Sequence, residues 1–355
     1  MNKDTHNEEI RKKRRKKRIN REGLSKEELR KDLARKKRIA TKKKRRKLMK
    51  LIGRFVTAVI ISSLMICAAG AGIYAARVYT TPYSSIATDF ASDTLETVRI
   101  SKEKCNILIM GTDKEGLRTD VMMLAQIDPT SGTATVMSIP RDTRVKYAGK
   151  QRKITEVHSV GLRKGEYGSE AAIKAVKELT GVPIHHFVKV NFDAFKDSID
   201  ELGGVEFDVP QRMKYTDPYQ DLYIDLQPGM QHLDGDKAEQ LVRFRRYKNG
   251  DLDRIKVQQD FLHALAEQKL KMKYIGKVDD IYDIVLENME TSMSPSNVID
   301  CGRQLLSIGT ENIVTITMPC TPQDIGGASY VIVDKEELQK VVETSFGYDA
   351  DGNEI

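Results

Sequence analysis

The stretch that decides the fold is Asn106–Asp142, which reads NILIMGTDKEGLRTDVMMLAQIDPTSGTATVMSIPRD. It contains three short apolar runs, NILIMGTD, DVMMLAQID and TATVMSIPRD, and each run ends in turn-forming or charged residues. Runs of this length and composition are typical of buried β-strands. Asp128-Pro129 followed by Ser131-Gly132 favours a tight turn, so the second and third runs are predicted to form a hairpin.

Helical and strand patterns alternate beyond this stretch. SEAAIKAVKELTG (Ser169–Gly181) predicts an amphipathic helix with a serine cap and a glycine stop. Further strands are predicted at His186–Phe192 and Val205–Pro210, and a long helix from about Leu252 to Met272. The C-terminal part adds a helix at Ser294–Ser307, the strands IVTITMP and YVIVD, and the helix KEELQKVVETSF. The predicted fold class is α/β, with a central mixed sheet flanked by helices on both faces.

An uncharged stretch of 22 residues, Phe55–Ala76, reads FVTAVIISSLMICAAGAGIYAA. At about 1.5 Å per residue it is long enough to cross a hydrocarbon core of about 30 Å. Basic residues crowd its N-terminal side, so the positive-inside rule places the N-terminus in the cytoplasm and the rest of the chain outside. A cleavable signal peptide is the alternative, but its apolar core and its basic region would both be shorter.

The charge of the chain is divided sharply between its two parts. Residues 1–54 contain 25 Lys/Arg and 7 Asp/Glu, a net charge of +18. The remaining residues contain 34 Lys/Arg and 44 Asp/Glu, a net charge of −10. The basic run cannot bury a core and is predicted to be disordered and attracted to anionic lipid. The acidic body argues against nucleic acid as a partner of the folded domain, because nucleic-acid binding depends on neutralising phosphates.

These observations predict five parts in the chain. They are a basic cytoplasmic tail (1–54), a transmembrane helix (55–77), a linker (78–103), an extracellular domain (104–346) and a C-terminal tail (347–355). Of the four cysteines, Cys67 lies in the predicted membrane segment, and the other three show no spacing typical of zinc sites. A Cys301–Cys320 disulfide and unpaired buried thiols are both compatible with the sequence.

Charged side chains gather where the predicted strands end, which is where ligands bind in α/β folds. Asp113 ends the first strand, Arg118 and Asp120 precede the second, and Arg141 follows the third. Asp142 and Arg144 come next, and a further charged group follows a short helix predicted to end at about Val242: Arg243, Arg245, Arg246, Asp251, Asp253 and Arg254.

Arginine binds phosphate oxygens through two parallel hydrogen bonds, and a pair of carboxylates can hold Mg²⁺ on the same phosphates. In an extended conformation, Val242–Arg245 would present Arg243 and Arg245 on one face, which suits a diphosphate. The alternative interpretation is that these charged residues form ordinary surface salt bridges. The chain has no GxSxG, HExxH, Walker or GxGxxG motif, so the pattern favours phosphoryl transfer by positioning and charge neutralisation.

Six motifs, in order, resemble those of the LytR–CpsA–Psr family. They are NILIMGTDKEGLRTDVMML, SIPRDT, LGGVEFDVP, PGMQHLDGDKAEQLVRFRR, GDLDR and Gln258-Gln259. The resemblance is dense over residues 104–270 and extends loosely to 346. A basic tail followed by one membrane anchor is also the layout of that family.

The resemblance implies a phosphotransferase on the outer face of a Gram-positive-type cell membrane. Such enzymes move a glycopolymer (a teichoic acid, a capsular or another wall polysaccharide) from an undecaprenyl diphosphate carrier to peptidoglycan. It also implies roles for single residues, with Asp113 and Asp120 holding Mg²⁺ or Mn²⁺ and an apolar tunnel holding the lipid. The residues implied to bind the diphosphate or lie near it are Arg118, Arg141, Arg243, Arg245, Asp251, Arg254 and Gln258.

The sequence departs from the family pattern at several positions. Where the family has DGDxGR, residues 249–254 read NGDLDR, and the stretch after SIPRDT carries Thr155 in place of the usual Asn. Val257 stands where an arginine often precedes the glutamine pair. These changes spare the implied metal and diphosphate residues and affect recognition of the polymer or the acceptor. Asp251 and Asp113 remain candidates for the general base, whereas Asp142 is interpreted as structural.

Two other functions remain open. A pyrophosphatase acting on the same lipid would use water as the acceptor and the same residues. A non-catalytic regulator would bind polyprenyl phosphates tightly without turnover.

Overall fold

The computed structural model describes residues 94–355 except 97, 99, 101, 114–115, 219–221, 249 and 272–288. The predicted cytoplasmic tail and transmembrane helix, and most of the predicted linker, lie outside the described residues. Within the described part of the chain, none of the helices has the length and apolar character needed to span a bilayer.

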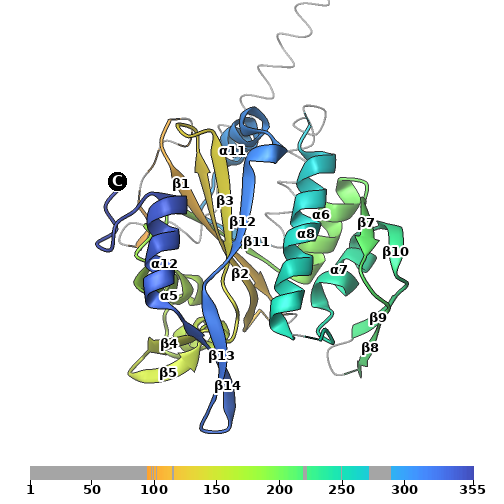
Figure 1. The fold of residues 1–355 in the computed structure, drawn as a ribbon, viewed down its shortest axis with the longest axis horizontal. Coiled ribbons are helices and arrows are strands. Elements are labelled where there is room, and N and C mark those ends of the chain that lie inside the picture. Colours follow the sequence, from red (N-terminus) through yellow and green to blue (C-terminus); the bar gives the residue numbers. More distant parts are fainter. Residues whose placement is uncertain are drawn as a thin grey trace, which may run out of the picture. The chain divides into compact units, whose positions relative to one another are not determined.

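The core of the domain is a six-stranded mixed sheet with the order β11-β6-β1-β2-β3-β12 (Figure 1). Its strands are β1 (Cys105–Thr112), β2 (Thr119–Asp128), β3 (Thr133–Ser138), β6 (His186–Val190), β11 (Met289–Thr291) and β12 (Ile313–Thr317). β1, β2 and β3 pair antiparallel in sequence order, while β6 runs parallel to β1 and β12 runs parallel to β3. The predicted hairpin and the predicted mixed sheet are therefore confirmed.

Both faces of the sheet are covered because its central strands are apolar on both sides. Successive side chains of a strand point to opposite faces. Leu108 and Met110 of β1 belong to one buried cluster, and Cys105 and Ile107 to another. The first cluster packs against α4 (Ile154–Arg163), α5 (Gly168–Thr180) and α12 (Lys335–Val341), which continues as η3 (Val342–Phe346); the second packs against α11 (Pro295–Ile308).

The predicted helix at Ser169–Gly181 is present, but its N-terminal cap differs from the prediction. The helix begins at Gly168, the N-cap residue Tyr167 makes no capping hydrogen bond through its side chain, and the Ser169 hydroxyl is buried without a partner. Gly168 fits there because a Cβ would approach the His158 ring to 2.6 Å. The predicted stop is confirmed, since Gly181 has φ of 71°, a left-handed conformation that favours glycine.

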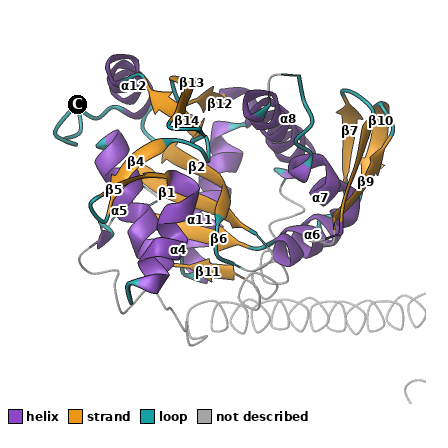
Figure 2. Ribbon diagram, turned by 90° about the horizontal axis from the view of Figure 1, so that it is seen from below, coloured by secondary structure: helices purple, strands orange, loops and turns teal. Residues whose placement is uncertain are grey.

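A separate set of elements forms a second lobe with its own buried cluster (Figure 2). Its elements are α6 (Phe192–Glu201), β7 (Val205–Val209), β8 (Met213–Asp217), β9 (Leu222–Leu226), β10 (Gly229–Leu233), α7 (Gly235–Arg243) and α8 (Asp251–Lys269). The predicted strand at 205–210 exists as β7, but it pairs with β10 and not with the central sheet. In β7 and β9, buried and exposed residues alternate strictly, so each strand buries one face only.

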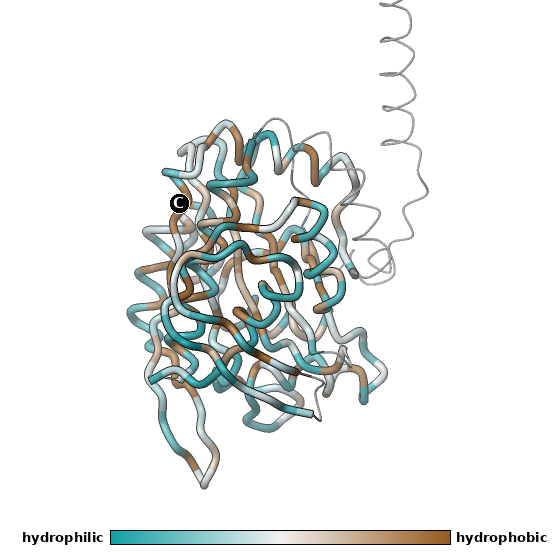
Figure 3. The backbone as a smooth tube through the Cα atoms, turned by 90° about the vertical axis from the view of Figure 1, so that its right-hand side faces the viewer, coloured by the Kyte–Doolittle hydropathy of each residue, from teal (hydrophilic) through white to brown (hydrophobic). Residues whose placement is uncertain are grey.

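Two hairpins complete the domain. β4 (Arg144–Tyr147) pairs with β5 (Lys150–Lys153), and β13 (Cys320–Ile325) pairs with β14 (Ala328–Val333). The β13–β14 hairpin projects from the body of the domain in Figures 1 and 3. A bridge between Thr143 and Val331 joins the two hairpins. A short 3-10 turn, η2 (Thr310–Asn312), precedes β12. Residues 347–355, predicted as a tail, include Tyr348, which is only 4% exposed and packs into the core.

The described cysteines are all free. Cys301 is buried in the same cluster as Cys105, and not beside Cys320, which lies half-buried at the start of β13. A hydrogen bond between the Cys301 and Cys105 thiols, together with burial, raises the pKa of Cys301 well above its usual range. The structure therefore shows buried thiols, and the thiol beside Cys301 is that of Cys105.

Candidate active site

The centre of the candidate site is Asp120, the second residue of β2. Its Oδ1 accepts a hydrogen bond from Nη1 of Arg141 at 2.7 Å, and its Oδ2 accepts one from Nη2 of Arg245 at 2.9 Å. The Asp120 side chain is only 13% exposed. Burial alone would raise the pKa of Asp120, but the charges of Arg245 and Arg141 outweigh it and hold the pKa below its ordinary value. Asp120 is therefore a permanent anion between two cations.

The fold brings these side chains together from distant parts of the sequence. Antiparallel pairing places the start of β2 beside the end of β3, and Arg141 lies three residues after β3, in the turn Pro140–Thr143. In that turn the hydroxyl of Thr143 donates to the carbonyl of Pro140 at 2.5 Å. Arg245 arrives from the second lobe, two residues after α7 ends. The site therefore lies where the central sheet and the second lobe meet.

The first turn of α8 adds a second ion pair. Arg254 is 3% exposed and pairs with Asp251, three residues earlier on the same helix. Burial lowers the pKa of Arg254, the charge of Asp251 raises it, and the nearby Arg141 and Arg245 lower it further. Asp120, Arg141, Arg245, Asp251 and Arg254 thus form one group, named here the charged cluster, with three cations and two anions.

Hydrogen-bonding capacity is left over inside the charged cluster. Nε of Arg141, Nε of Arg254 and Oδ2 of Asp251 are buried and have no hydrogen-bond partner. Buried polar atoms without partners are costly, and in native proteins they are often kept for a ligand or a reaction. A cavity of about 10 Å³ lies among Asp120, Arg141, Asp251 and Arg254.

An apolar cavity of about 170 Å³ adjoins the charged cluster, between the sheet and helices α6 and α8. Its lining is almost entirely apolar: Ile109, Met110, Gly111, Val121, Met123, Val190, Asn191, Phe192, Phe195, Val242, Gln258, Phe261, Leu262 and Leu265. Val121, Met123 and Gln258 line both this cavity and the small charged one. The small charged cavity and the apolar cavity therefore share lining residues, between the sheet and the helices, where a lipid tunnel was expected.

Arg243 lies outside the ion pairs of the charged cluster. It is the last residue of α7, its Nη1 is 2.6 Å from Oε1 of Glu239, and its guanidinium lies 4.3 Å from the centroid of the Phe192 ring. The expected extended conformation of Val242–Arg245 does not form, because α7 continues through Arg243. Phe192 lines the apolar cavity, so Arg243 lies next to that cavity. Sequence reasoning missed Glu239 and Phe192, since no local pattern marks either as a partner of Arg243.

Asp113 shapes the loop between β1 and β2. Its Oδ1 accepts hydrogen bonds from the backbone N–H groups of Leu117, at 2.8 Å, and Arg118, at 3.2 Å. The Arg118 side chain is exposed and makes no ion pair within the part of the chain that is described. The loop is also held by the buried His158, whose Nδ1 lies 3.2 Å from the carbonyl oxygen of Leu117. Sequence reasoning missed His158, which lies in the KITEVH stretch without any ligand-like spacing.

The glutamine pair on α8 connects the site to the rest of the fold. Gln258 donates its amide to the carbonyl of Val242 at 2.9 Å, which ties α8 to the end of α7. Gln259 donates to the hydroxyl of Ser138 and to the carbonyl of Ile316, both at 3.0 Å, which ties α8 to the sheet. Asp142, interpreted as structural, pairs with Lys153 at 2.9 Å.

Two carboxylates were expected to hold a divalent cation, Asp113 and Asp120. Among the described residues no group of three or more His, Cys, Asp or Glu side chains is arranged to hold a metal ion. Both oxygens of Asp120 are hydrogen-bonded to arginines, while Asp113 uses only Oδ1, for its own loop. The donors are hard oxygens, which suit Mg²⁺ when substrate phosphates and water supply the remaining ligands.

Comparison with known proteins identifies relatives over most of the chain. The LytR_cpsA_psr family model matches residues 74–346. The polyisoprenyl-teichoic acid–peptidoglycan teichoic acid transferase TagV of Bacillus subtilis is 30% identical over 262 residues, covering 70% of this chain and 66% of TagV, just under two thirds of its length. TagU of Oceanobacillus iheyensis is also 30% identical, covering 68% of this chain and 74% of TagU.

Solved structures agree with this assignment. The crystal structure of B. subtilis TagV superposes with a TM-score of 0.59 at 30% identity, covering 68% of this chain and 96% of that one. A structure of TagT bound to LI-WTA shares the fold, with a TM-score of 0.56 at 24% identity over 69% of this chain and 90% of that one. The family model covers well over half of the chain, and this chain belongs to the LytR_cpsA_psr family.

Proposed function

We propose that this chain is a membrane-anchored phosphotransferase that moves a teichoic acid or another wall glycopolymer from an undecaprenyl diphosphate carrier to peptidoglycan. Its relatives TagV and TagU are named as teichoic acid transferases that use polyisoprenyl-linked teichoic acid and peptidoglycan, which supports this reaction. The observation that carries the proposal is the charged cluster lying against an apolar cavity. A lipid diphosphate needs both environments side by side, the charged cluster for its phosphates and the apolar cavity for its prenyl chain.

The charged cluster supports binding of a diphosphate in two ways. Its three guanidinium groups outnumber its two carboxylates, and Nε of Arg141 and Nε of Arg254 have unused hydrogen-bonding capacity. Arginine pairs with phosphate oxygens through a planar fork of donors. Arg243, next to the apolar cavity, would meet the phosphate on the lipid side, and the exposed Arg118 would meet the one on the polymer side.

Asp113 and Asp120 would hold the divalent cation, Mg²⁺ or Mn²⁺, with the diphosphate oxygens as further ligands. Bound there, the ion would neutralise charge on the diphosphate. The negative charge that Asp120 keeps between two arginines supports this role, since metal ligands must be deprotonated.

The proposed reaction is an in-line displacement at phosphorus. A hydroxyl oxygen of peptidoglycan forms a bond to the polymer-linked phosphorus while the bond from that phosphorus to the bridging oxygen breaks. Undecaprenyl phosphate leaves with the electron pair, and the arginines stabilise its charge. The hydroxyl proton passes to a carboxylate, for which Oδ2 of Asp251 is the better candidate because it is buried without a hydrogen-bond partner. Asp113, by contrast, shapes its loop through Oδ1 and is one of the residues proposed to hold the divalent cation.

The membrane arrangement follows from the sequence and is part of the same proposal. Residues 55–77 would form the single transmembrane helix, residues 1–54 would remain in the cytoplasm, and the domain would face outward. Such an anchor would hold the domain at the bilayer, where its lipid substrate is found.

Replacing Arg141 by alanine tests the proposal. The variant should transfer polymer about 10²–10³-fold more slowly, because one charged donor to the developing phosphate charge is lost. Its thermal unfolding should change little. Arg303→Ala is the matched control, because this exposed arginine on α11 lies outside the charged cluster and pairs with Asp300. Transfer by Arg141→Ala at the wild-type rate would contradict the proposed site.

Product analysis in the same assay separates the reaction from its closest rival. Polymer joined to peptidoglycan through a phosphodiester identifies a transferase. Release of free phosphorylated polymer identifies a pyrophosphatase, which would use the same residues with water as the acceptor.

A further inference from the structure

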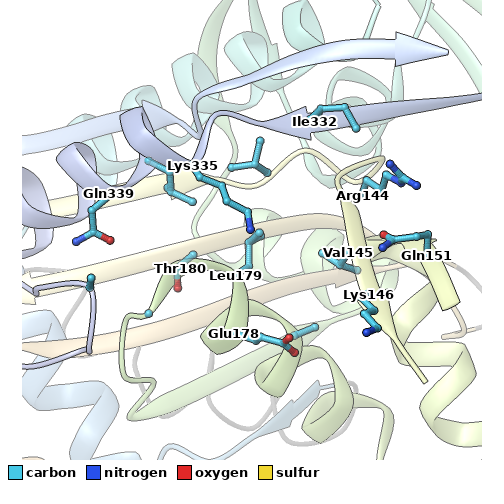
Figure 4. A pocket seen from close by; sticks show the side chains of 15 residues that line it. Arg144, Val145, Lys146, Gln151, Glu178, Leu179, Thr180, Ile332, Lys335 and Gln339 are labelled. Atoms are coloured by element: carbon cyan, nitrogen blue, oxygen red, sulfur yellow. The ribbon is translucent and has the colours of Figure 1, made fainter. Parts of the chain in front are cut away.

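A cavity of about 650 Å³ lies apart from the charged cluster. It is enclosed by the β4–β5 hairpin, the C-terminal end of α5, the end of β14 and the start of α12 (Figure 4). None of its lining residues lines the apolar cavity or the small charged cavity. Its size is typical of pockets that bind small molecules or segments of larger ones.

Three basic side chains line this cavity without an acidic partner. Arg144 and Lys146 come from β4, and Lys335 comes from the start of α12. Within the described part of the chain none of the three makes an ion pair, and the only acidic residue of the lining is Glu178. Figure 4 shows Lys335 reaching across toward Leu179 of α5. The cavity is therefore a basic surface on a body with an excess of acidic residues.

The Arg144 guanidinium is held in place yet keeps a free donor. It lies 5.7 Å from the centroid of the Tyr330 ring on β14, a distance compatible with a cation–π contact. Its Nε is buried and has no hydrogen-bond partner. A fixed guanidinium with spare capacity, beside two exposed lysines, suits an anion with several oxygen atoms.

A short, fixed segment connects this cavity to the charged cluster. Arg141 belongs to the charged cluster and Arg144 lines the cavity, so their Cα atoms lie at most about 11 Å apart, the span of three extended residues. β14 holds this segment, because the N–H of Val331 donates to the carbonyl of Asp142 at 2.9 Å. Asp142 itself is paired with Lys153.

We propose that this cavity binds a phosphodiester group of the anionic polymer whose terminal phosphate occupies the charged cluster. The inference rests on the proposed function, because that function brings a polymer with repeated phosphates to Arg141. A chain leaving the charged cluster toward Arg144 meets three cations with no competing ion pair, and the cavity has room for the alditol or sugar next to the phosphate. The cavity then selects polymers that carry charge beyond the terminal diphosphate.

The test uses the full chain in detergent and a charge-reversal variant, Lys146→Glu with Lys335→Glu. Both lysines are exposed, so the fold should be unaffected. The matched control is Lys164→Glu with Lys214→Glu, which changes the net charge equally at exposed positions outside the cavity. Binding of a soluble, lipid-free glycerol-phosphate oligomer is measured by calorimetry at low and high salt.

The cavity variant should bind this oligomer about tenfold more weakly than the wild type or the control, since two charge-assisted contacts are lost. Kinetics give a second readout that does not need the oligomer. The KM for a lipid diphosphate carrying several glycerol-phosphate repeats should rise about tenfold in the variant, while the KM for one carrying only an uncharged disaccharide should not change.

Equal binding of the oligomer by variant and wild type overturns the proposal, as does an equal change of KM for both substrates. A muropeptide that binds through Lys335 while the glycerol-phosphate oligomer does not would also overturn it, and would assign the cavity to the acceptor. Failure of the proposed function would give a different experimental result from failure of this inference. The wild type would then transfer neither substrate, although binding of the oligomer could still depend on Lys146 and Lys335.

Discussion

At the scale of single residues, the charged cluster depends on a balance of charge around Asp120. One carboxylate is shared by Arg141 and Arg245, and Arg254 lies close enough to influence its pKa. The arginines repel one another, and Asp120 is the anion that keeps them together. A diphosphate can take over that role, because it brings more negative charge than one carboxylate.

Asp120→Asn tests this balance. The amide keeps the shape but removes the charge, so the arginines should repel, and we expect a loss of about 1–3 kcal/mol in the free energy of unfolding. Transfer activity should fall at least about 10²-fold. Denaturant unfolding and the transfer assay measure the two effects. High phosphate or sulfate should restore part of the lost stability, and unchanged stability in low salt would contradict the prediction.

Substitution of Gln126, which lies on β2 like Asp120, tests a buried polar network. The residue is 3% exposed, and its amide donates to Oδ1 of Asn106 at 3.0 Å and to the carbonyl of Phe346 at 2.9 Å. Gln126→Ala leaves both acceptors buried without this donor, so we expect a loss of about 2–4 kcal/mol in the free energy of unfolding. Gln151→Ala, at an exposed position of β5, should change it by less than about 0.5 kcal/mol. Similar values for the two variants in urea unfolding would refute the role of the network.

At the scale of elements, α8 connects the two halves of the site. Its first turn carries Asp251 and Arg254, and its next turns supply Gln258, Phe261, Leu262 and Leu265 to the apolar cavity. The glutamine pair fixes the helix to α7 on one side and to the sheet on the other. One rigid helix thus sets the distance between the charged groups and the cavity.

Leu265→Trp should fill part of the apolar cavity without touching the charged cluster. We expect a higher KM for a substrate with a long prenyl chain and little change for one with a short chain, because only the long chain needs the cavity. His263→Trp is the control, since His263 is exposed on the same helix. Kinetics with the two substrates measure the effect. If Leu265→Trp and His263→Trp behave alike with the long-chain substrate, the cavity does not hold the lipid.

At the scale of the whole molecule, His158 and His185 are buried and His186 is half-buried, and the pKa of each is lowered so that the neutral form is favoured. Burial lowers the pKa of His158, of His185 and of His186, the last to about 4. His186 joins β6 to α11 through Asn297, and it also contacts Ser292, which follows β11. His185 accepts a hydrogen bond from the backbone N–H of Asn106 at 2.8 Å. These contacts hold the strands of the sheet and the elements beside them together, so their loss should lower the free energy of unfolding of the whole domain.

The lowered pKa values predict acid destabilisation of the fold. Below about pH 6.5 the unfolded chain takes up protons that the folded chain does not, so the free energy of unfolding falls as the pH drops toward 4. A shift from 6.5 to about 4 for His186 corresponds to a contribution on the order of 3 kcal/mol. That contribution is fully present above pH 6.5. Urea unfolding at pH 7.5 and at pH 4.5 measures it.

His186→Gln assigns the effect to one side chain. The variant should be less stable than the wild type at pH 7.5, and the difference should shrink at pH 4.5, because glutamine takes up no proton. A difference that stays constant between the two pH values would contradict the assignment.

The sequence alone determined the strands of the central sheet other than β11, and it indicated candidate residues for the site. Apolar runs such as Asn106–Met110 form strands because their side chains can be buried on both faces, and Gly181 ends α5 because the chain needs a left-handed residue there. Ordered motifs then indicated the family. All of this depends on residues close together in the chain.

Only the tertiary structure decided which charged groups meet. Arg141 and Arg245 share Asp120, while Arg243, two residues before Arg245, turns to Glu239 and Phe192. Strand β7 pairs with β10 outside the central sheet, and Cys301 meets Cys105 rather than Cys320. The physical reason is the same in each case. Ion pairs, strand partners and cavities depend on distances in space between segments far apart in the chain, and packing sets those distances.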